Sequence, residues 1–511
     1  MEAALRQSPF LVLLLLCLWA CSGPVTFPQP PERIASGQTK APPDAPLVIV
    51  SDRLTRGHPG QTGVYPVTSA HNALAVRLAV IRAARSSIDI QYFIFRHDET
   101  GLLLTRELLR AAERGVRVRF LLDDFTTGDA GKLLLALQRH PNIQIRLFNP
   151  FPHRGPRTLE LLADFRRLHR RMHNKSFTAD GRVTFIGGRN LSNKYFGFDS
   201  KEHFGDLDLI AIGAVVPEIT RQFDIYWNSH YSFPVQSVIH ERLDPERQRQ
   251  FSAELLRKAE KFLASDYGRS LLKSPVIKTL SHNANLWYWG PAHALFDPPR
   301  KVAQPPGTEG GFAGGELMRR ITGARRQLII ISPYLLPGEH YLQQLIAAAE
   351  RGVEVYILTN SLASSDVILV HGAYRKYRRP LLEAGVHLYE LSSALKYKLD
   401  SWHGESRSLL HAKLFAVDGQ WLYVGSFNLD QRSILLNTEL GLMIKSPQLT
   451  EMVSKNLIAN VHKNAYQLLL RNNRIVWRRS DGAELHREPD TNWLQRMGSR
   501  LSGWLPLESL L

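Results

Sequence analysis

Two stretches of the sequence, residues 173–190 and 411–428, carry the same chemical residues at the same spacing. In each, His and Lys stand two residues apart, an Asp follows five residues after the Lys, and the stretch ends in Gly-Gly or Gly-Ser, one further residue and Asn. An imidazole can attack phosphorus or move a proton, an ammonium can neutralise a phosphoryl oxygen, and an amide can hydrogen-bond one. The pattern therefore indicates phosphate chemistry with two histidines. The candidate catalytic residues are His173, Lys175, Asn190, His411, Lys413 and Asn428.

Each stretch must place these groups with two strands and a tight turn. Asp180-Gly181 and Asp418-Gly419 each separate two apolar, β-favouring runs, which is a strong hairpin signal. Because strand side chains alternate, the His and Lys of one copy point to the same face. We assign Asp180 and Asp418 to the turns and not to catalysis. The small residues that end the second strand are expected to let a ligand approach the backbone closely.

A surface hairpin and a metal site fit the pattern less well. A lone unit of this kind would fit a basic hairpin on the surface, but two copies in one register do not. A metal site is not expected, because Lys is a poor ligand and each Asp lies beyond the turn from its His.

At these residues the chain resembles the phospholipase D superfamily, whose HxKxxxxD signature followed by G-G/S-x-N occurs here twice. The resemblance covers nearly all of the chain after the first few dozen residues. Among the branches, the chain is most similar to bacterial cardiolipin synthases that end in Leu-Pro-x-Glu-Ser-Leu-Leu, as residues 505–511 do here. The resemblance implies two pseudo-symmetric halves that share one active-site cleft. It also implies phospholipid substrates and no cofactor.

The resemblance also implies a two-step mechanism through a phosphohistidine. By position, His173 is the nucleophile and His411 the general acid and base, although the near symmetry of the motifs leaves their order open. The Lys and Asn residues would hold the phosphoryl oxygens. Asp206 and Glu439 align after the two motifs and would orient an imidazole through its other nitrogen.

The acceptor of the transferred group decides the function. A phosphatidylglycerol hydroxyl would make the chain a phosphatidyltransferase that forms cardiolipin, with phosphatidylglycerol or phosphatidylethanolamine as donor. Water would make it a phospholipase, or an exported nuclease that needs no metal. The third hypothesis is a lipid-binding protein without turnover.

The motifs belong to a longer repeat of α/β type. Strand and helix patterns at 87–95, 102–114 and 116–122 recur at 327–332, 341–351 and 353–358. The hexapeptide AAERGV at 111–116 and 348–353 begins 62 and 63 residues before the two histidines. After each Asn come an acid-led strand and a helix, at 206–212 and 217–227 and again at 439–444 and 449–461. We expect a mixed, mostly parallel sheet flanked by helices in each half.

Composition divides the chain into six segments. These are a lipoprotein-type signal peptide (1–20), a Pro-rich tether (21–46), a first half (47–238), a connector (239–306), a second half (307–470) and a C-terminal tail (471–511).

The N-terminus indicates the cell envelope, whereas the net charge of +17 would attract polyanions, either nucleic acid or an anionic lipid surface, and composition does not choose between them. A short apolar run ends in Leu-Trp-Ala-Cys, which makes Cys21 the expected lipidation site; an uncleaved anchor and a plain secretory signal are the alternatives. Ser22 follows Cys21 where an acidic residue would favour the inner membrane, so we prefer the periplasmic face of the outer membrane. The expected partner is an anionic phospholipid membrane; nucleic acid is disfavoured and the oligomeric state stays open.

Two further patterns allow two interpretations each. Residues 165–171 (FRRLHRR) contain four arginines that fit a solvated helix face or a binding site for phosphate head groups. Residues 491–511 place Trp493, Met497, Leu501 and Trp504 or Leu505 along one helical stripe, with Arg496 and Arg500 beside it. That stripe fits core packing or docking to a lipid interface.

Overall fold

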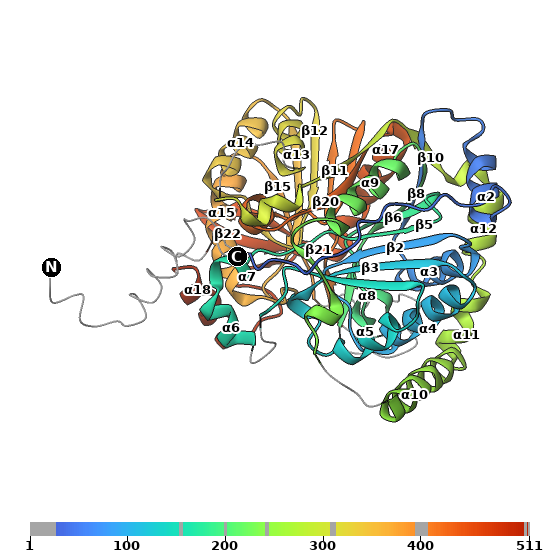
Figure 1. Ribbon diagram of the computed structural model, residues 1–511. Coiled ribbons are helices and arrows are strands. Elements are labelled where there is room, and N and C mark those ends of the chain that lie inside the picture. Colours follow the sequence, from blue (N-terminus) through green and yellow to red (C-terminus); the bar gives the residue numbers. More distant parts are fainter. Residues whose placement is uncertain are drawn as a thin grey trace.

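The computed structural model describes residues 27–152, 157–198, 202–240, 245–306, 313–393, 407–504 and 508. Two large mixed sheets, one from each half of the chain, form the centre of the molecule, and helices flank them (Figure 1). The predicted signal peptide and Cys21 lie outside the described residues.

The first sheet has the strand order β10-β1-β8-β6-β5-β2-β3-β4-β9. Its strands are β1 (Thr62–Val67), β2 (Ser87–Tyr92), β3 (Arg117–Asp123), β4 (Ile143–Phe148), β5 (Ser176–Ala179), β6 (Val183–Gly187), β8 (Asp208–Gly213), β9 (Ser232–Pro234) and β10 (Tyr288–Gly290). The main helices of this half are α3 (Ala70–Ala83), α4 (Glu99–Glu113), α5 (Gly131–Gln138) and α9 (Val216–Trp227).

The second sheet has the order β11-β20-β18-β17-β12-β14-β15-β21-β22-β23. Its strands are β11 (Ala292–Phe296), β12 (Gln327–Ile331), β14 (Glu354–Asn360), β15 (His387–Leu391), β17 (Leu414–Val417), β18 (Trp421–Gly425), β20 (Leu440–Lys445), β21 (Ala465–Arg471), β22 (Arg474–Arg478) and β23 (Glu484–Leu485). Its main helices are α13 (Ala313–Thr322), α14 (Gly338–Glu350), α15 (Ile368–Glu383), α17 (Pro447–Asn464) and α18 (Trp493–Ser502).

The two sheets repeat one topology, which confirms the predicted α/β fold with two related halves. The order β1-β8-β6-β5-β2-β3-β4 of the first corresponds to β11-β20-β18-β17-β12-β14-β15 of the second. Both hairpins occur where Asp-Gly predicted them, with β5 and β6 joined at Asp180 and β17 and β18 joined at Asp418.

The prediction that each sheet is mostly parallel is wrong. In the two large sheets as described, only β2–β3, β3–β4, β12–β14 and β14–β15 pair in parallel. Parallel pairing needs a long crossover, which α4 and α14 supply between neighbouring strands. The motif hairpin instead turns straight back, and its two strands also pair antiparallel with β2 and β8.

The segment 239–306 contributes to both halves. Helices α10 (Pro245–Leu263), α11 (Asp266–Lys273) and α12 (Val276–His282) pack against α4 and α3 of the first half. After them, β10 pairs with β1 and β11 pairs with β20. The chain thus crosses from one sheet to the other at Pro291.

The predicted tether is extended but not free where it is described. Before α2 (Pro46–Thr55), the backbone NH groups of Ser36 and Gln38 donate to the side chains of Asn228 and Asp224 on the first half. Phe27 also packs edge-on against Tyr231, with ring centroids 4.6 Å apart.

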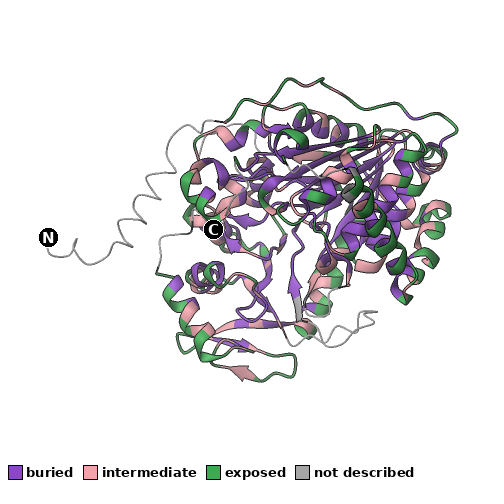
Figure 2. Cartoon of the chain, turned by 60° about the horizontal axis from the view of Figure 1, so that its bottom comes forward, coloured by how far each residue is buried: buried purple, intermediate pink, exposed green. Residues whose placement is uncertain are grey.

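A shared apolar core joins the two halves. Ile186 and Leu209 of the first sheet belong to one buried cluster with Leu422 and Val424 of the second. Figure 2 shows the strands buried at the centre and the exposed surface mainly on the helices. The two motif hairpins therefore meet at the contact between the halves. Their histidines lie at the same contact.

Candidate active site

Each motif histidine is held by the opposite half of the chain. The backbone NH of His173 donates to the carbonyl of Thr438, and that of His411 donates to the carbonyl of Gly205, both at 2.9 Å. The strand β7 (Glu202–Gly205) pairs with β16 (Arg407–Leu410) directly before His411. The contact between the halves therefore fixes where both motifs begin.

The predicted orienting acids pair with the histidines across the two halves. His173 Nδ1 lies 2.9 Å from Glu439 Oε2, and His411 Nδ1 lies 2.6 Å from Asp206 Oδ2. Both histidine side chains are 11% exposed and both carboxylates are fully buried. A carboxylate at Nδ1 directs Nε2 toward the reacting group.

Burial and nearby cations keep both imidazoles neutral. Burial, with Lys175 and Lys413 adding to it, lowers the pKa of His173 to about 4 although Glu439 opposes the shift. Burial and Lys413 lower the pKa of His411 to about 3, against the effect of Asp206. At neutral pH each ring thus has an unprotonated nitrogen.

The two lysines lie beside these rings. Lys175 Nζ donates to the backbone carbonyl of His173 at 2.6 Å, and Lys413 Nζ lies 3.1 Å from His411 Nδ1. Burial lowers the pKa of Lys175 to about 7 and that of Lys413 to about 8. Each lysine and the histidine of the other motif act on one another electrostatically, so the two motifs form one site.

The carboxylates differ in what supports them. The hydroxyls of Ser426 and Ser433 both donate to Glu439, the latter at 2.8 Å. Asp206 accepts from the backbone NH of Leu207 at 2.8 Å. A Cβ at Gly188 would lie 2.2 Å from Asp206 Oδ1, so this glycine makes room for the carboxylate. We expected the small residues to let a ligand approach the backbone. At Gly188 the space is instead occupied by the side chain of Asp206.

The two motif asparagines are also unlike. Asn190 accepts from the backbone NH of Ile94 at 3.1 Å and donates to the Tyr195 hydroxyl at 2.9 Å. Asn428 is buried, and its Oδ1 has no hydrogen-bond partner among the described residues. The structure therefore commits the Asn190 side chain to holding the loop before it, whereas the side-chain oxygen of Asn428 is unused.

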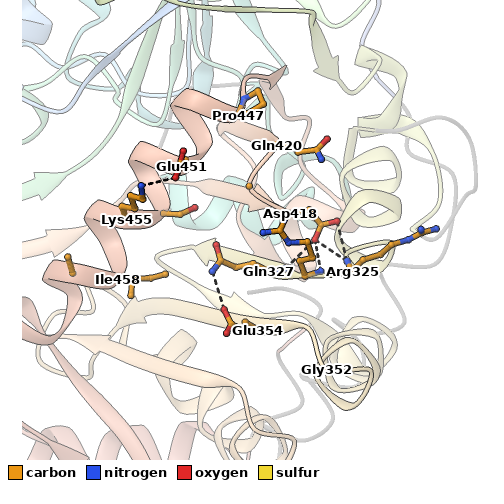
Figure 3. Close-up of a pocket in the computed structure, with 14 residues that line it drawn as sticks. Arg325, Gln327, Gly352, Glu354, Asp418, Gln420, Pro447, Glu451, Lys455 and Ile458 are labelled. Carbon is orange, nitrogen blue, oxygen red and sulfur yellow. Dashed lines mark hydrogen bonds and ion pairs between the residues drawn. The ribbon is translucent and has the colours of Figure 1, made fainter.

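The motif aspartates lie at the turns, at the far ends of their strands. Asp180 accepts from the backbone NH groups of Arg85, Ser86 and Ser87, and has φ of 51°. Asp418 makes the same bonds to residues 325–327 and lines a separate pocket of about 1250 Å³ (Figure 3). We propose that both act in stability alone.

The arginines of residues 165–171 are mostly inside the protein. Arg171 pairs with Asp123 at 2.7 Å, Arg167 with Asp164 at 2.6 Å, and Arg170 donates to the carbonyl of Gln304. All three are at least 98% buried. Both interpretations of the sequence pattern, a solvated face and a phosphate site, fail for these three because the surrounding loops take their donors.

Sequence reasoning missed the aromatic walls of the site. Phe93 lies edge-on to His173 at 5.2 Å between ring centroids, and Tyr195 and Phe204 each lie 5.1 Å from His411. Tyr195, five residues after Asn190, could have been noticed from its spacing. Phe93 and Phe204 carry no local signal, because the fold alone brings them to the rings.

A second cluster of ionisable groups lies away from the site. His371, Glu390 and Glu488 are close enough to share an ion. However, the guanidinium of Arg378 binds both carboxylates, at 2.7 and 2.6 Å, and His371 Nε2 at 2.9 Å. The guanidinium of Arg378 thus occupies the position that a metal ion would take between these three side chains.

Two cross-paired His–carboxylate dyads on duplicated α/β halves define a phosphotransfer protein with one composite site. A family profile described as "Cardiolipin synthase, PLD-like domain" matches residues 78–227 and 317–460. Cardiolipin synthase C of Escherichia coli (strain K12) is 39% identical over 464 residues, covering 89% of this chain and 97% of that protein. The chain belongs to the cardiolipin synthase family of phospholipase D-like proteins.

More distant comparisons agree. The cardiolipin synthase of Geobacillus kaustophilus (strain HTA426) is 26% identical over 81% of this chain and 69% of that protein. The crystal structure of phosphatidylserine synthase from Haemophilus influenzae Rd KW20 has a TM-score of 0.59 at 14% identity, covering 90% of this chain and all of that one. The predicted superfamily, fold class and enzyme class, a phosphatidyltransferase, are confirmed.

One structural result concerns the membrane. Among the helices of the described residues, none combines the length and the apolar character that a membrane span requires.

Proposed function

We propose that this protein transfers a phosphatidyl group to a hydroxyl of phosphatidylglycerol, forming cardiolipin through a phosphohistidine on His173. The observation that carries the proposal is the cross-pairing of the two dyads, His173–Glu439 and His411–Asp206. It gives two imidazoles, each with Nδ1 bound to a carboxylate, in one site with two ammonium groups. Membership of the cardiolipin synthase family supports a lipid acceptor.

In the first step, Nε2 of His173 attacks phosphorus and forms a P–N bond while the P–O bond to the donor's alcohol breaks. Glu439 stabilises the positive charge that develops on the ring. The leaving oxygen takes a proton from His411. Burial and Lys413 lower the pKa of that ring in the free protein, and the negative charge of the bound phosphodiester raises it, so His411 takes up a proton from water when the substrate binds.

In the second step, His411 takes the proton from the acceptor hydroxyl, whose oxygen attacks phosphorus. The P–N bond breaks and His173 returns to its neutral form. Lys175 and Lys413 bind the phosphoryl oxygens in both steps, and the buried amide of Asn428 adds a donor.

Ser426 and Ser433 favour His173 as the nucleophile. His173, Lys175 and the hydroxyl of Ser426 hold the pKa of Glu439 below its usual range although burial alone would raise it, so Glu439 stays anionic beside a ring that becomes positively charged. Ser433 donates a further hydrogen bond to the same carboxylate. Asp206 has no serine partner at the equivalent position, because Gly188 stands where Ser426 stands in the second motif.

We further propose that the protein is exported and acylated at Cys21, on the periplasmic face of the outer membrane. The apolar run before Cys21 and the neutral Ser22 after it support this placement. Radiolabelled palmitate should enter the wild-type chain and not Cys21→Ser; equal labelling of both would refute acylation at this residue.

The function is tested by mass spectrometry of lipids after the full chain is incubated with vesicles of phosphatidylglycerol and phosphatidylethanolamine. Cardiolipin should form with the wild-type protein and not with His411→Ala. Release of glycerol or ethanolamine identifies the donor. Phosphatidic acid without cardiolipin would show a hydrolase instead, and unchanged lipids with degraded DNA would show a nuclease.

A further inference from the structure

The C-terminal helix α18 buries a polar face and exposes an apolar one, which is the opposite of a helix that packs against a hydrophobic core. Its buried residues are Ser499 and Ser502, which contact His371 and Gly372 of α15. Its large apolar residues are all exposed, which is unusual for Trp, Leu and Met together. They are Trp493, Leu494, Met497 and Leu501, followed by Trp504 after the helix end.

These apolar residues form one stripe. At 3.6 residues per turn they fall within an arc of about 100° on the helix. Trp493 is 62% exposed and Trp504 is 84% exposed. Core packing, one of the two interpretations that the sequence allowed, is therefore wrong for this stripe. A capping box between Asn492 and Gln495 fixes where the helix begins, so the stripe is an ordered surface.

The charges beside the stripe have one sign. Arg496 and Arg500 lie along one edge of it, and α18 contains no acidic residue. Exposed tryptophans flanked by arginines are the composition of helices that lie in the head-group layer of a bilayer. A net charge of +17 for the whole chain adds attraction to anionic lipid.

The start of α15 lies beside the stripe and leads toward the surroundings of His411. Ile368 and Leu369, at the start of α15, are exposed, and Ile368 is the nearest neighbour of Gly498 in α18. Two residues earlier, Asp366 accepts a hydrogen bond from Tyr334 at 2.8 Å. The charge of Asp366 also acts on Lys413, opposing the effect of burial on its pKa.

A second exposed apolar group lies on the His173 side. Leu159 and Leu162 of α6 (Arg157–Ala163) are exposed. Arg157 binds the backbone carbonyl of Phe125 at 2.6 Å, and Phe125 stacks on Phe93. Figure 1 places α6 and α18 at the same end of the molecule, with α2, α11 and α12 at the other.

We infer that the α18 stripe, together with Ile368 and Leu369, docks this enzyme onto the head-group layer of a bilayer rich in anionic phospholipid, with the active site facing the lipid. The inference rests on the proposed function, because a lipid substrate gives this face its occupant. Docking brings the scissile phosphate to the histidines without removing the lipid from the bilayer.

The test uses the full chain carrying Cys21→Ser, so that acylation does not contribute to binding. Vesicles contain phosphatidylglycerol with brominated acyl chains, which quench tryptophans at the interface. Quenching should be clear for this parent protein and be largely lost in Trp493→Phe/Trp504→Phe. Equal quenching of both proteins would overturn the inference.

A second variant, Leu494→Gln/Met497→Gln/Leu501→Gln, tests the kinetic consequence. Its rate on phosphatidylglycerol vesicles should fall about tenfold, which corresponds to about 1.4 kcal/mol of docking free energy. Its rate on a monomeric short-chain phosphatidylglycerol should stay within about twofold. The matched control is Ile49→Gln/Leu272→Gln, which removes exposed apolar residues on α2 and α11 and should change neither rate.

The remaining outcomes separate the two proposals. Quenching without any lipid product would keep the docking surface and refute phosphatidyl transfer. Formation of the lipid product with an unaltered rate of the α18 variant on vesicles would support phosphatidyl transfer and refute the docking surface. A shift of the α18 variant to a smaller species by light scattering, without a change in vesicle binding, would show that the stripe joins two copies of the chain and would overturn docking.

Discussion

The carboxylate of Glu439 should contribute more to turnover than to stability. In Glu439→Gln the amide oxygen can still accept from His173 Nδ1, and the amide NH2 can donate to the hydroxyl of Ser426 or Ser433. The local geometry is thus retained while the negative charge is lost. The substitution therefore raises the free energy only of the state in which the His173 ring is positively charged.

The size of the effect follows from the geometry. The carboxylate lies 2.9 Å from Nδ1, which puts its charge about 4 Å from the centre of charge of the ring. At an effective dielectric constant of about 20, opposite unit charges at that separation attract by about 4 kcal/mol. Since about 1.4 kcal/mol is tenfold in rate, the turnover number should fall roughly a thousandfold.

The assay is single-turnover formation of radiolabelled phosphoenzyme, read beside steady-state cardiolipin synthesis. Glu439→Gln should slow phosphoenzyme formation and, through it, steady-state synthesis. Asp206→Asn, which acts on His411, should slow both the protonation of the leaving oxygen in the first step and the deprotonation of the acceptor in the second. Asp418→Asn is the matched control, because the hydrogen bonds of Asp418 within the described part of the chain all come from backbone NH groups at the far turn. A Glu439→Gln enzyme that is folded and retains more than a tenth of the wild-type rate would refute the reasoning.

Two further predictions concern protons and turns. Because burial lowers the pKa of Lys175 to about 7 and that of Lys413 to about 8, kcat/KM should fall as the pH rises through 7 to 8 and the phosphate-binding charges are lost. Over the same range stability should rise, since unfolded lysines titrate near about 10.4 and the unfolded chain therefore holds more protons between about pH 7 and 10; a thermal-melt series in which stability falls from pH 7 to 9 would contradict the lowered values. Asp180→Ala should lower the free energy of unfolding by about 2–4 kcal/mol, because three backbone NH groups lose a buried charged acceptor. Asp418→Ala should cost less, since Arg325 and Arg326 are exposed to water, and denaturant melts that rank the two variants in the opposite order would show that burial does not set the cost.

Local residue chemistry was sufficient to predict the hairpins and the duplicated elements. Asp-Gly favours a turn whatever surrounds it, and β5–β6 and β17–β18 form where it occurs. The helix periods of residues 102–114 and 341–351 likewise correspond to α4 and α14. The parallel sheet was predicted wrongly because strand direction depends on which strands become neighbours, and single-strand patterns carry no information on that.

The sequence by itself was sufficient to propose the ionisable residues of the candidate site, since His173, His411, Asp206 and Glu439 were all identified from their types and positions, whereas its aromatic walls were not. Only the tertiary structure decided that each histidine takes its carboxylate from the other half, because β7 pairs with β16 directly before His411, and Met172 pairs with Thr438 directly before His173 and Glu439. The same holds for Arg167, Arg170 and Arg171, which are buried, and for α18, whose apolar stripe is exposed. Burial is a property of what packs on a segment, so it cannot be read from the segment alone.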